Sequence, residues 1–195
     1  MLLKNTITSS SDKILFTPGP LTTSQTVKLA MLRDLGSRDA EFIEIVKQIR
    51  RSLLKLAGVD DKEYEAIIMQ GSGTFSVEAV LSSVTPPYGK WLVINNGAYC
   101  QRIIKIAEIL KIPVVSLDYP ENVQPNLQDI DLTLSNDPSI THVASVHCET
   151  TSGIINPIKE IGSIVKKHNK KYFVDAMSSF GAVPINLAEF GIDYL

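Results

Sequence analysis

The sequence predicts an α/β protein with a mostly parallel sheet sandwiched by helices. From residue 63 onward, short apolar runs of strand length alternate with longer segments of helical periodicity. The runs are apolar at nearly every position, and strands of that kind are buried on both faces, as in parallel sheets covered by crossover helices. The hydrophobic content of 44% and the charged content of 21% provide enough apolar material for one sizeable core.

The first predicted element is an amphipathic helix ahead of this core. Its apolar residues recur at helical spacing: Phe42, Ile45, Val46, Ile49, Leu53 and Leu56. Ser37 or Asp39 is available as the N-cap, and Gly58 as the C-terminal stop. We expect this helix to pack one face. Upstream, residues 17–20 (TPGP) predict a defined loop, because two fixed proline φ angles flank a glycine.

Five apolar runs are predicted strands, and the amphipathic segments between them are predicted helices. The strands are residues 66–69, 91–94, 114–117, 142–146 and 172–174. The helices are a segment beginning at Thr74, residues 97–110 and residues 158–168. Residues 191–195 resemble the start of a further strand, so the fold is expected to continue there.

Charge, cysteine usage and the first residues exclude several classes of protein. A formal net charge of −2 gives no long-range field for nucleic acid or an anionic membrane. Cys100 and Cys148 have no CxxC or His-linked metal spacing, which favours free thiols in a reducing compartment. Residues 1–12 contain no apolar run of signal-peptide length. We therefore expect a cytoplasmic protein without a membrane span.

The segment Gln70-Gly71-Ser72-Gly73-Thr74 follows a predicted strand and opens a predicted helix. Unpaired backbone N–H groups and the helix dipole can bind a phosphate at such a position. The segment lacks the lysine of a P-loop and the full GxGxxG spacing, so a small phosphorylated cofactor fits better than a triphosphate or NAD. A tight turn without a ligand would have the same sequence, and this motif alone does not separate the two.

Two further strand ends carry an aspartate and an aromatic residue. Asp175 follows the strand at 172–174, where it is either a cap for the next segment or a partner for a ligand's cationic group. Tyr99 lies just after the strand at 91–94, in Asn95-Asn96-Gly97-Ala98-Tyr99. It could stack on a planar ring or pack against the sheet. Taken singly, capping and packing are the commoner roles.

A fourth strand end offers a cluster of hydroxyl groups in residues 147–153 (HCETTSG). An ordinary polar turn, with Gly153 supplying a positive φ, is the alternative to a ligand site. No second His, Cys or Asp stands at metal-ligand spacing from His147, so we expect no bound metal. Together the four strand ends are more specific than any one, because a planar pyridinium that carries a phosphate would use all of them.

These motifs resemble those of a known enzyme family, the 2-aminoethylphosphonate:pyruvate transaminases, in the class V branch of the fold-type I aminotransferases. The resemblance covers residues 14–195. The strings that carry it are TPGPLTTS (17–24), GSRDAEF (36–42), QGSGTFSVEAVL (70–81), NNGAY (95–99), HCETTSG (147–153) and DAMSSFGAVPI (175–185). Alanine:glyoxylate aminotransferases share the general layout but are less similar at GSRDAEF and DAMSSFG.

The resemblance implies pyridoxal 5′-phosphate as the cofactor and assigns roles by position. Ser72, Gly73 and Thr74 would hold the cofactor phosphate, and Tyr99 and Met177 would pack on opposite faces of its ring. Thr150 would contact the cofactor beside its phenolic oxygen, and Asp175 would pair with the pyridine nitrogen. Gly19, in the 17–20 loop, would line the substrate pocket. Residues 1–30 would form an N-terminal segment with this loop, and residues 31–195 the cofactor-binding large domain.

The resemblance also implies an activity and a missing group. The activity is transfer of the amino group of 2-aminoethylphosphonate to pyruvate, giving phosphonoacetaldehyde and alanine, in a homodimer. The family's Schiff-base lysine would fall beyond Leu195, together with the small C-terminal domain. Lysines 159, 166, 167, 170 and 171 are predicted to be solvated charges. The 195-residue chain is therefore expected to be inactive alone. An alanine:glyoxylate-type aminotransferase and a non-catalytic truncated remnant are the alternatives.

Overall fold

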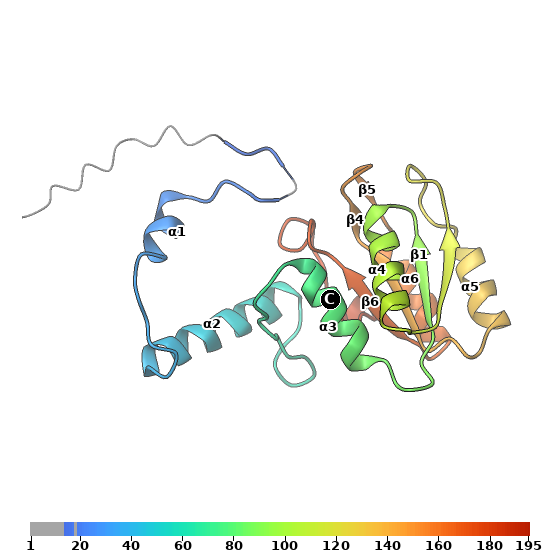
Figure 1. Ribbon diagram of the computed structural model, residues 1–195, viewed down its shortest axis with the longest axis horizontal. Helices are drawn as coiled ribbons and strands as arrows, with labels where there is room; N and C mark the ends of the chain where they lie inside the picture. The colour runs from blue at the N-terminus through green and yellow to red at the C-terminus, as the bar shows by residue number, and fades with distance from the viewer. Residues whose placement is uncertain (1–13, 18) are drawn as a thin grey trace, which may run out of the picture.

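A four-stranded parallel sheet flanked by helices forms the core of the fold in a computed structural model that describes residues 14–17 and 19–195 (Figure 1). Its strands are β1 (Trp91–Asn95), β2 (Val114–Asp118), β3 (His142–Val146) and β6 (Lys171–Asp175), in the spatial order β2-β1-β3-β6. Every neighbouring pair is parallel. The α/β class and four of the five predicted strands are therefore confirmed.

Seven helices and a small hairpin complete the described part of the chain. The helices are α1 (Gln25–Ala30), α2 (Ala40–Leu56), α3 (Gly73–Val84), α4 (Ala98–Ile109), α5 (Leu127–Asn136), α6 (Ile158–Lys167) and α7 (Leu187–Phe190). The hairpin pairs β4 (Cys148–Glu149) with β5 (Ile154–Ile155) in antiparallel fashion. The predicted helices at 74, 97–110 and 158–168 correspond to α3, α4 and α6.

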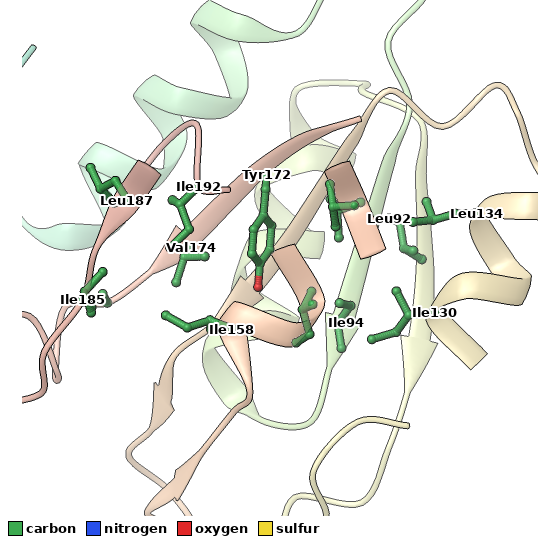
Figure 2. Close-up of a cluster of buried hydrophobic side chains, with 14 of the residues drawn as sticks. Leu92, Ile94, Ile130, Leu134, Ile158, Tyr172, Val174, Ile185, Leu187 and Ile192 are labelled. Atoms are coloured by element: carbon green, nitrogen blue, oxygen red, sulfur yellow. The ribbon is translucent and has the colours of Figure 1, made fainter. Parts of the chain in front are cut away.

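The core lies on both faces of the sheet, because successive residues of a strand point to opposite faces. In β1, Leu92 and Ile94 face a cluster that includes apolar residues of α5 and α6, as Figure 2 shows. Trp91 and Val93 of the same strand face a second cluster with residues of α3 and α4. This two-sided burial is the reason that the strands are apolar at nearly every position.

Replacement of Leu92 by alanine should lower the free energy of unfolding by about 2–5 kcal/mol, because Leu92 is fully buried and its removal leaves a cavity. Leu132→Ala, on α5, is the matched control, since Leu132 is 59% exposed and its replacement should cost about 0.5 kcal/mol or less. Urea denaturation of both variants measures the difference. Equal costs at the two positions would contradict the two-sided core.

The prediction of a strand at 66–69 is wrong. No strand forms there, and Ile67 and Ile68 are 79% and 52% exposed. The edge of the sheet beside β6 is instead occupied by Tyr194, whose N–H donates to the Tyr172 carbonyl (3.0 Å) and whose carbonyl accepts from the Val174 N–H (2.9 Å). An apolar run becomes a strand only where its backbone groups find partners in another strand, and residues 66–69 pair with none of the described strands. The strand-like character predicted for 191–195 is seen as this parallel bridge.

Helix α2 forms as predicted, but the expectation that it packs one face is wrong. It runs from Ala40 to Leu56, and Gly58, which follows its C-cap Ala57, has a φ of 72°, in the left-handed region that favours glycine. Only Leu54 of the helix is buried, whereas Leu53 and Leu56 are 37% and 51% exposed. The helix is attached at its C-terminal end, where the Leu187 N–H donates to the Ala57 carbonyl at 3.0 Å, and it extends away from the sheet (Figure 1).

The segment before α2 makes few contacts with the core. Thr17, Gly19 and Pro20 lie outside helices and strands, as predicted for this loop, while Pro18 falls outside the described residues. Helix α1 contains no buried residue, and its end at Ala30 coincides with the predicted boundary between residues 1–30 and 31–195, a division that stays a prediction. Within the described ranges, no helix has both the length and the apolarity needed to cross a membrane.

Candidate active site

The predicted functional segments meet at the carboxyl edge of the sheet. β1 ends at Asn95, β3 at Val146 and β6 at Asp175, and Val146 is directly in register with Asp175. The segments that follow these strands therefore emerge side by side, as ligand-binding segments do in parallel α/β sheets. Helix α3 brings its N-terminus to the same place, since the residues at its start share a cavity with Asp175.

This cavity has a volume of about 160 Å³ and collects residues from three separate parts of the chain. It is lined by Ser72, Gly73, Thr74, Val77, Tyr99, Arg102, Ile103, Asp175 and Met177. Six of the eight residues to which the sequence assigns a binding role are among them. The residues farthest apart in sequence are Ser72 and Met177. The tertiary fold is thus what assembles the site.

The N-terminus of α3 has the features of an anion cradle. Ser72 is the N-cap but makes no side-chain capping bond, and the first bond beyond it runs from the Phe75 N–H to the Ser72 carbonyl (2.9 Å). The N–H groups at the start of a helix have no intrahelical acceptor, and they carry the positive end of its dipole. Gly71, with φ 145°, makes the turn into the helix. These N–H groups are available for a phosphate.

Gly73 makes room in the cradle. A Cβ at this position would lie 2.3 Å from the Met177 Cε atom, so a side chain would displace Met177 from the cavity wall. The Thr74 hydroxyl, next along the chain, accepts a hydrogen bond from Arg102 at 3.1 Å. The start of α3 therefore contacts both other walls of the cavity.

Asp175 provides the negative group of the cavity. Burial raises the pKa of its carboxyl above the ordinary value, and the Met177 N–H (3.1 Å to Oδ1) and the charge of Arg102 partly oppose this shift. The side chain is thus not only a cap for the following segment, since it also lines the cavity. A cationic N–H donor that binds beside a buried carboxylate of this kind stabilises its ionised form.

Arg102 is a cavity residue that the sequence interpretation missed. Its guanidinium lies 5.1 Å from the centre of the Tyr99 ring and donates to the Thr74 hydroxyl. The signal was present, because positions 99 and 102 are three residues apart on a predicted helix and so share one face. Arg102 adds a positive charge beside the proposed phosphate cradle.

Thr150 and Gly19 are the two predicted site residues that do not line the cavity. Thr150 lies in the turn between β4 and β5, directly after Glu149, whose carboxylate accepts a hydrogen bond from the Tyr99 N–H. Gly19 is exposed, and an added Cβ would meet no atom within 4 Å. Met177, by contrast, lines the cavity while remaining 68% exposed.

His147 and the two cysteines do not line the cavity, and His147 and Cys100 are buried among other protein groups. The His147 ring is buried, its Nδ1 lies 2.9 Å from the Ser179 hydroxyl, and burial lowers the pKa of the imidazole. Cys100 and Cys148 are free thiols, and Cys100 donates to the Ile94 carbonyl at 3.0 Å. Among residues 14–17 and 19–195, no three His, Cys, Asp or Glu side chains form a group that could hold a metal ion.

The fold and the site together define a class of protein: α/β enzymes that bind a small phosphorylated cofactor at the carboxyl edge of a parallel sheet. The family follows from comparison with known proteins. Residues 7–195 match the model of the aminotransferase class-V family, and the chain belongs to that family. Its aminotransferases depend on pyridoxal 5′-phosphate.

Similar sequences carry one common name. A 2-aminoethylphosphonate–pyruvate transaminase of Vibrio vulnificus is 50% identical over 186 residues, which is 95% of this chain and 50% of that protein. An enzyme of the same name from Lysinibacillus sphaericus is 49% identical over 92% of this chain and 49% of its own length. The chain thus spans about half the length of the relatives it matches.

Solved structures agree on the fold. The ureidoglycine–glyoxylate aminotransferase of Bacillus subtilis superposes with a TM-score of 0.85 at 28% identity, covering 91% of this chain and 45% of that one. The pyridoxamine–pyruvate aminotransferase of Mesorhizobium loti gives 0.83 at 26% identity, with the same coverage. An alanine–glyoxylate aminotransferase from Nostoc sp. gives 0.82 at 27% identity, covering 92% and 47%. The fold of this chain is therefore similar to that of the matching part of these enzymes.

Proposed function

We propose that this chain provides the cofactor site of an aminotransferase that moves the amino group of 2-aminoethylphosphonate to pyruvate, giving phosphonoacetaldehyde and alanine. The observation that carries the proposal is the cavity, which has a helix N-terminus at one side and the partly buried carboxylate of Asp175 at another. The name shared by relatives of about 50% identity supports this choice of substrates.

The residues present fit pyridoxal 5′-phosphate. The N–H groups of Ser72, Gly73 and Thr74 would hold the phosphate, since N–H groups at the start of a helix have no intrahelical acceptor. Tyr99 and Met177 would lie against the ring, and Asp175 would accept a hydrogen bond from the pyridine nitrogen. Thr150 would reach the phenolic oxygen only if the β4–β5 turn moved toward the cavity, because it does not line the cavity here.

The bound cofactor would supply an electron sink for the substrate carbon that loses a proton. The role of Asp175 is to hold a proton on the pyridine nitrogen, and its buried position strengthens that interaction. Arg102 would balance part of the phosphate charge. No lysine lines the cavity, so the group that moves the substrate proton is not supplied by these walls.

Three further features belong to the same proposal. The active form would be a homodimer, as the resemblance implies, and it would lie in the cytoplasm, as expected from the cysteine usage and the first residues. The 17–20 loop, with Gly19, would line the substrate pocket, as the resemblance implies, although Gly19 does not line the cavity described above.

Amino-donor assays test the proposed activity. They use the complete gene product, which is the protein encoded by the whole open reading frame. With pyridoxal phosphate, 2-aminoethylphosphonate and pyruvate, we expect alanine to form with a kcat/KM at least about tenfold above that with any alternative donor, which is about 1.4 kcal/mol of discrimination. Formation of glycine from alanine and glyoxylate at a higher kcat/KM would favour the second candidate, an alanine:glyoxylate-type enzyme, to which a solved structure of the same fold corresponds. Absence of turnover with both pairs would indicate a non-catalytic remnant.

A further inference from the structure

Glu149 is a buried acidic residue to which neither the motifs nor the proposed function give a role. Its side chain is fully buried, and acidic side chains are rarely buried without partners. It lies at the end of β4, next to the start of α4. Its two carboxylate oxygens have different partners, and these partners belong to two different segments of the candidate active site.

One oxygen holds the segment that carries Tyr99. Glu149 Oε2 accepts a hydrogen bond from the Tyr99 backbone N–H at 3.2 Å, within the first turn of α4. A carboxylate at this place satisfies an N–H group that has no intrahelical acceptor, and it is favoured by the helix dipole. The bond fixes the backbone from which the Tyr99 ring enters the cavity.

The other oxygen holds the β4–β5 turn. Glu149 Oε1 accepts a hydrogen bond from the Thr151 hydroxyl at 3.2 Å, and the Gly153 N–H closes the turn on the Glu149 carbonyl at 2.7 Å. Thr150 lies between these contacts. One carboxylate therefore joins the two segments that carry Tyr99 and Thr150.

Gly97 leaves space for this link. Its φ of 171° is extended backbone that any residue adopts, so conformational freedom does not require a glycine. Space does: a Cβ on Gly97 would lie 2.3 Å from Glu149 Cγ and 2.4 Å from its Oε2. The glycine before α4 and the glutamate after β3 form one close-packed pair.

We infer that Glu149 is a positioning residue of the cofactor site: its carboxylate, seated against Gly97, sets the position of the Tyr99 ring relative to the β4–β5 turn. The inference rests on the proposed function, because the object of this positioning is the cofactor ring. It adds to that function a residue that does not touch the cavity and acts through Tyr99.

The test is a double-mutant cycle on the affinity of the 195-residue chain for pyridoxal phosphate, followed by quenching of protein fluorescence and by the absorbance of the cofactor. Glu149→Ala should raise the Kd about tenfold or more, because it removes the side-chain acceptor of the Tyr99 N–H. In a Tyr99→Ala background the same change should alter Kd less than about twofold, since the ring to be positioned is gone. Glu149→Gln, which keeps an oxygen for the Tyr99 N–H, should restore most of the affinity.

Two further variants keep the test decisive. Gly97→Ala should raise Kd as Glu149→Ala does, and should add little to it in the double variant, where the space is free. Glu108→Ala, at the exposed far end of α4, is the matched control and should leave Kd unchanged. If Glu149 stabilised only the fold, its replacement would lower the melting temperature and leave the Kd of the folded variants unchanged. That result would overturn this inference but not the proposed function. Absence of cofactor binding to the wild-type chain would overturn the proposed function and this inference with it.

Discussion

Asp175→Asn should weaken pyridoxal phosphate binding by about 10²-fold or more, and should lower kcat of the complete gene product by at least as much. Removal of one partner of a buried charge pair costs about 3–5 kcal/mol, and the lower end applies because Asp175 is only partly buried. The asparagine keeps the shape and a hydrogen-bonding oxygen but cannot stabilise a proton on the pyridine nitrogen. Equilibrium titration with the cofactor, alongside steady-state kinetics, measures both effects.

Asp118→Asn is the matched control for this prediction. Asp118 ends β2 at the same edge of the sheet, but it does not line the cavity, and it is bonded to Ser116 (2.5 Å) and Asn95 (2.7 Å). Its replacement should change cofactor affinity less than about twofold, as expected of a surface position away from the site. Equal losses in the two variants would show that carboxylates at this edge act on the fold and not on the cofactor.

The pH dependence of cofactor binding gives a second, independent signature of Asp175. Burial raises the pKa of the Asp175 carboxyl in the cofactor-free chain, so the folded state favours the protonated form. The protonated carboxyl therefore stabilises the fold at pH below its ordinary pKa, and this stabilisation is lost as pH rises through the raised pKa. A cationic ring binds the ionised form. Affinity should therefore fall as pH is lowered through the raised pKa, and Asp175→Asn should abolish that part of the pH profile. An unchanged profile in the variant would contradict the assigned pairing.

A polypeptide of these 195 residues should form no alanine from 2-aminoethylphosphonate and pyruvate above the rate with free pyridoxal phosphate. The walls of the cavity contain no lysine. Three of the five lysines considered as substitutes are held by ion pairs elsewhere: Lys159 with Glu189, Lys167 with Asp131 and Lys171 with Asp193. A positioned general acid–base contributes about 10²–10⁴-fold in rate, and that factor would be absent.

The complete gene product, assayed at equal concentration, is the control for this second prediction. If the complete gene product is active and the 195-residue chain is not, the proton-transfer group lies outside the described cavity. Turnover by the 195-residue chain itself would refute the prediction. So would reduction with borohydride that fixes the cofactor to one defined lysine of this chain.

The sequence predicted the sheet and most of the site because their signals are local. A strand that is apolar at every position, followed by a glycine-rich turn, indicates both a buried strand and a place where a ligand can approach the backbone. Two residues found from such local signals do line one cavity: Asp175, the last residue of β6, and Gly73 at the start of α3, although no strand forms ahead of α3. Arg102 could have been found in the same way from its helical spacing to Tyr99.

The features that the sequence did not reveal depend on neighbours distant along the chain. Residues 66–69 have the composition of a strand, but the strand edge beside β6 is taken by Tyr194. The apolar face of α2 repeats at helical spacing, yet Leu53 and Leu56 stay 37% and 51% exposed. In the sequence, Glu149 looks like an ordinary polar turn residue. Its role follows only from its contacts with Gly97 and Tyr99, about 50 residues earlier in the chain.

The central claim is that the start of α3, the start of α4 after β1 and the end of β6 form one pyridoxal phosphate site. A crystal structure of the complete gene product with the cofactor tests it most directly. We expect the phosphate within about 3 Å of the N–H groups of Ser72, Gly73 and Thr74, and the pyridine nitrogen at a similar distance from the Asp175 carboxylate. A cofactor bound elsewhere, or oriented with its phosphate away from α3, would contradict the claim.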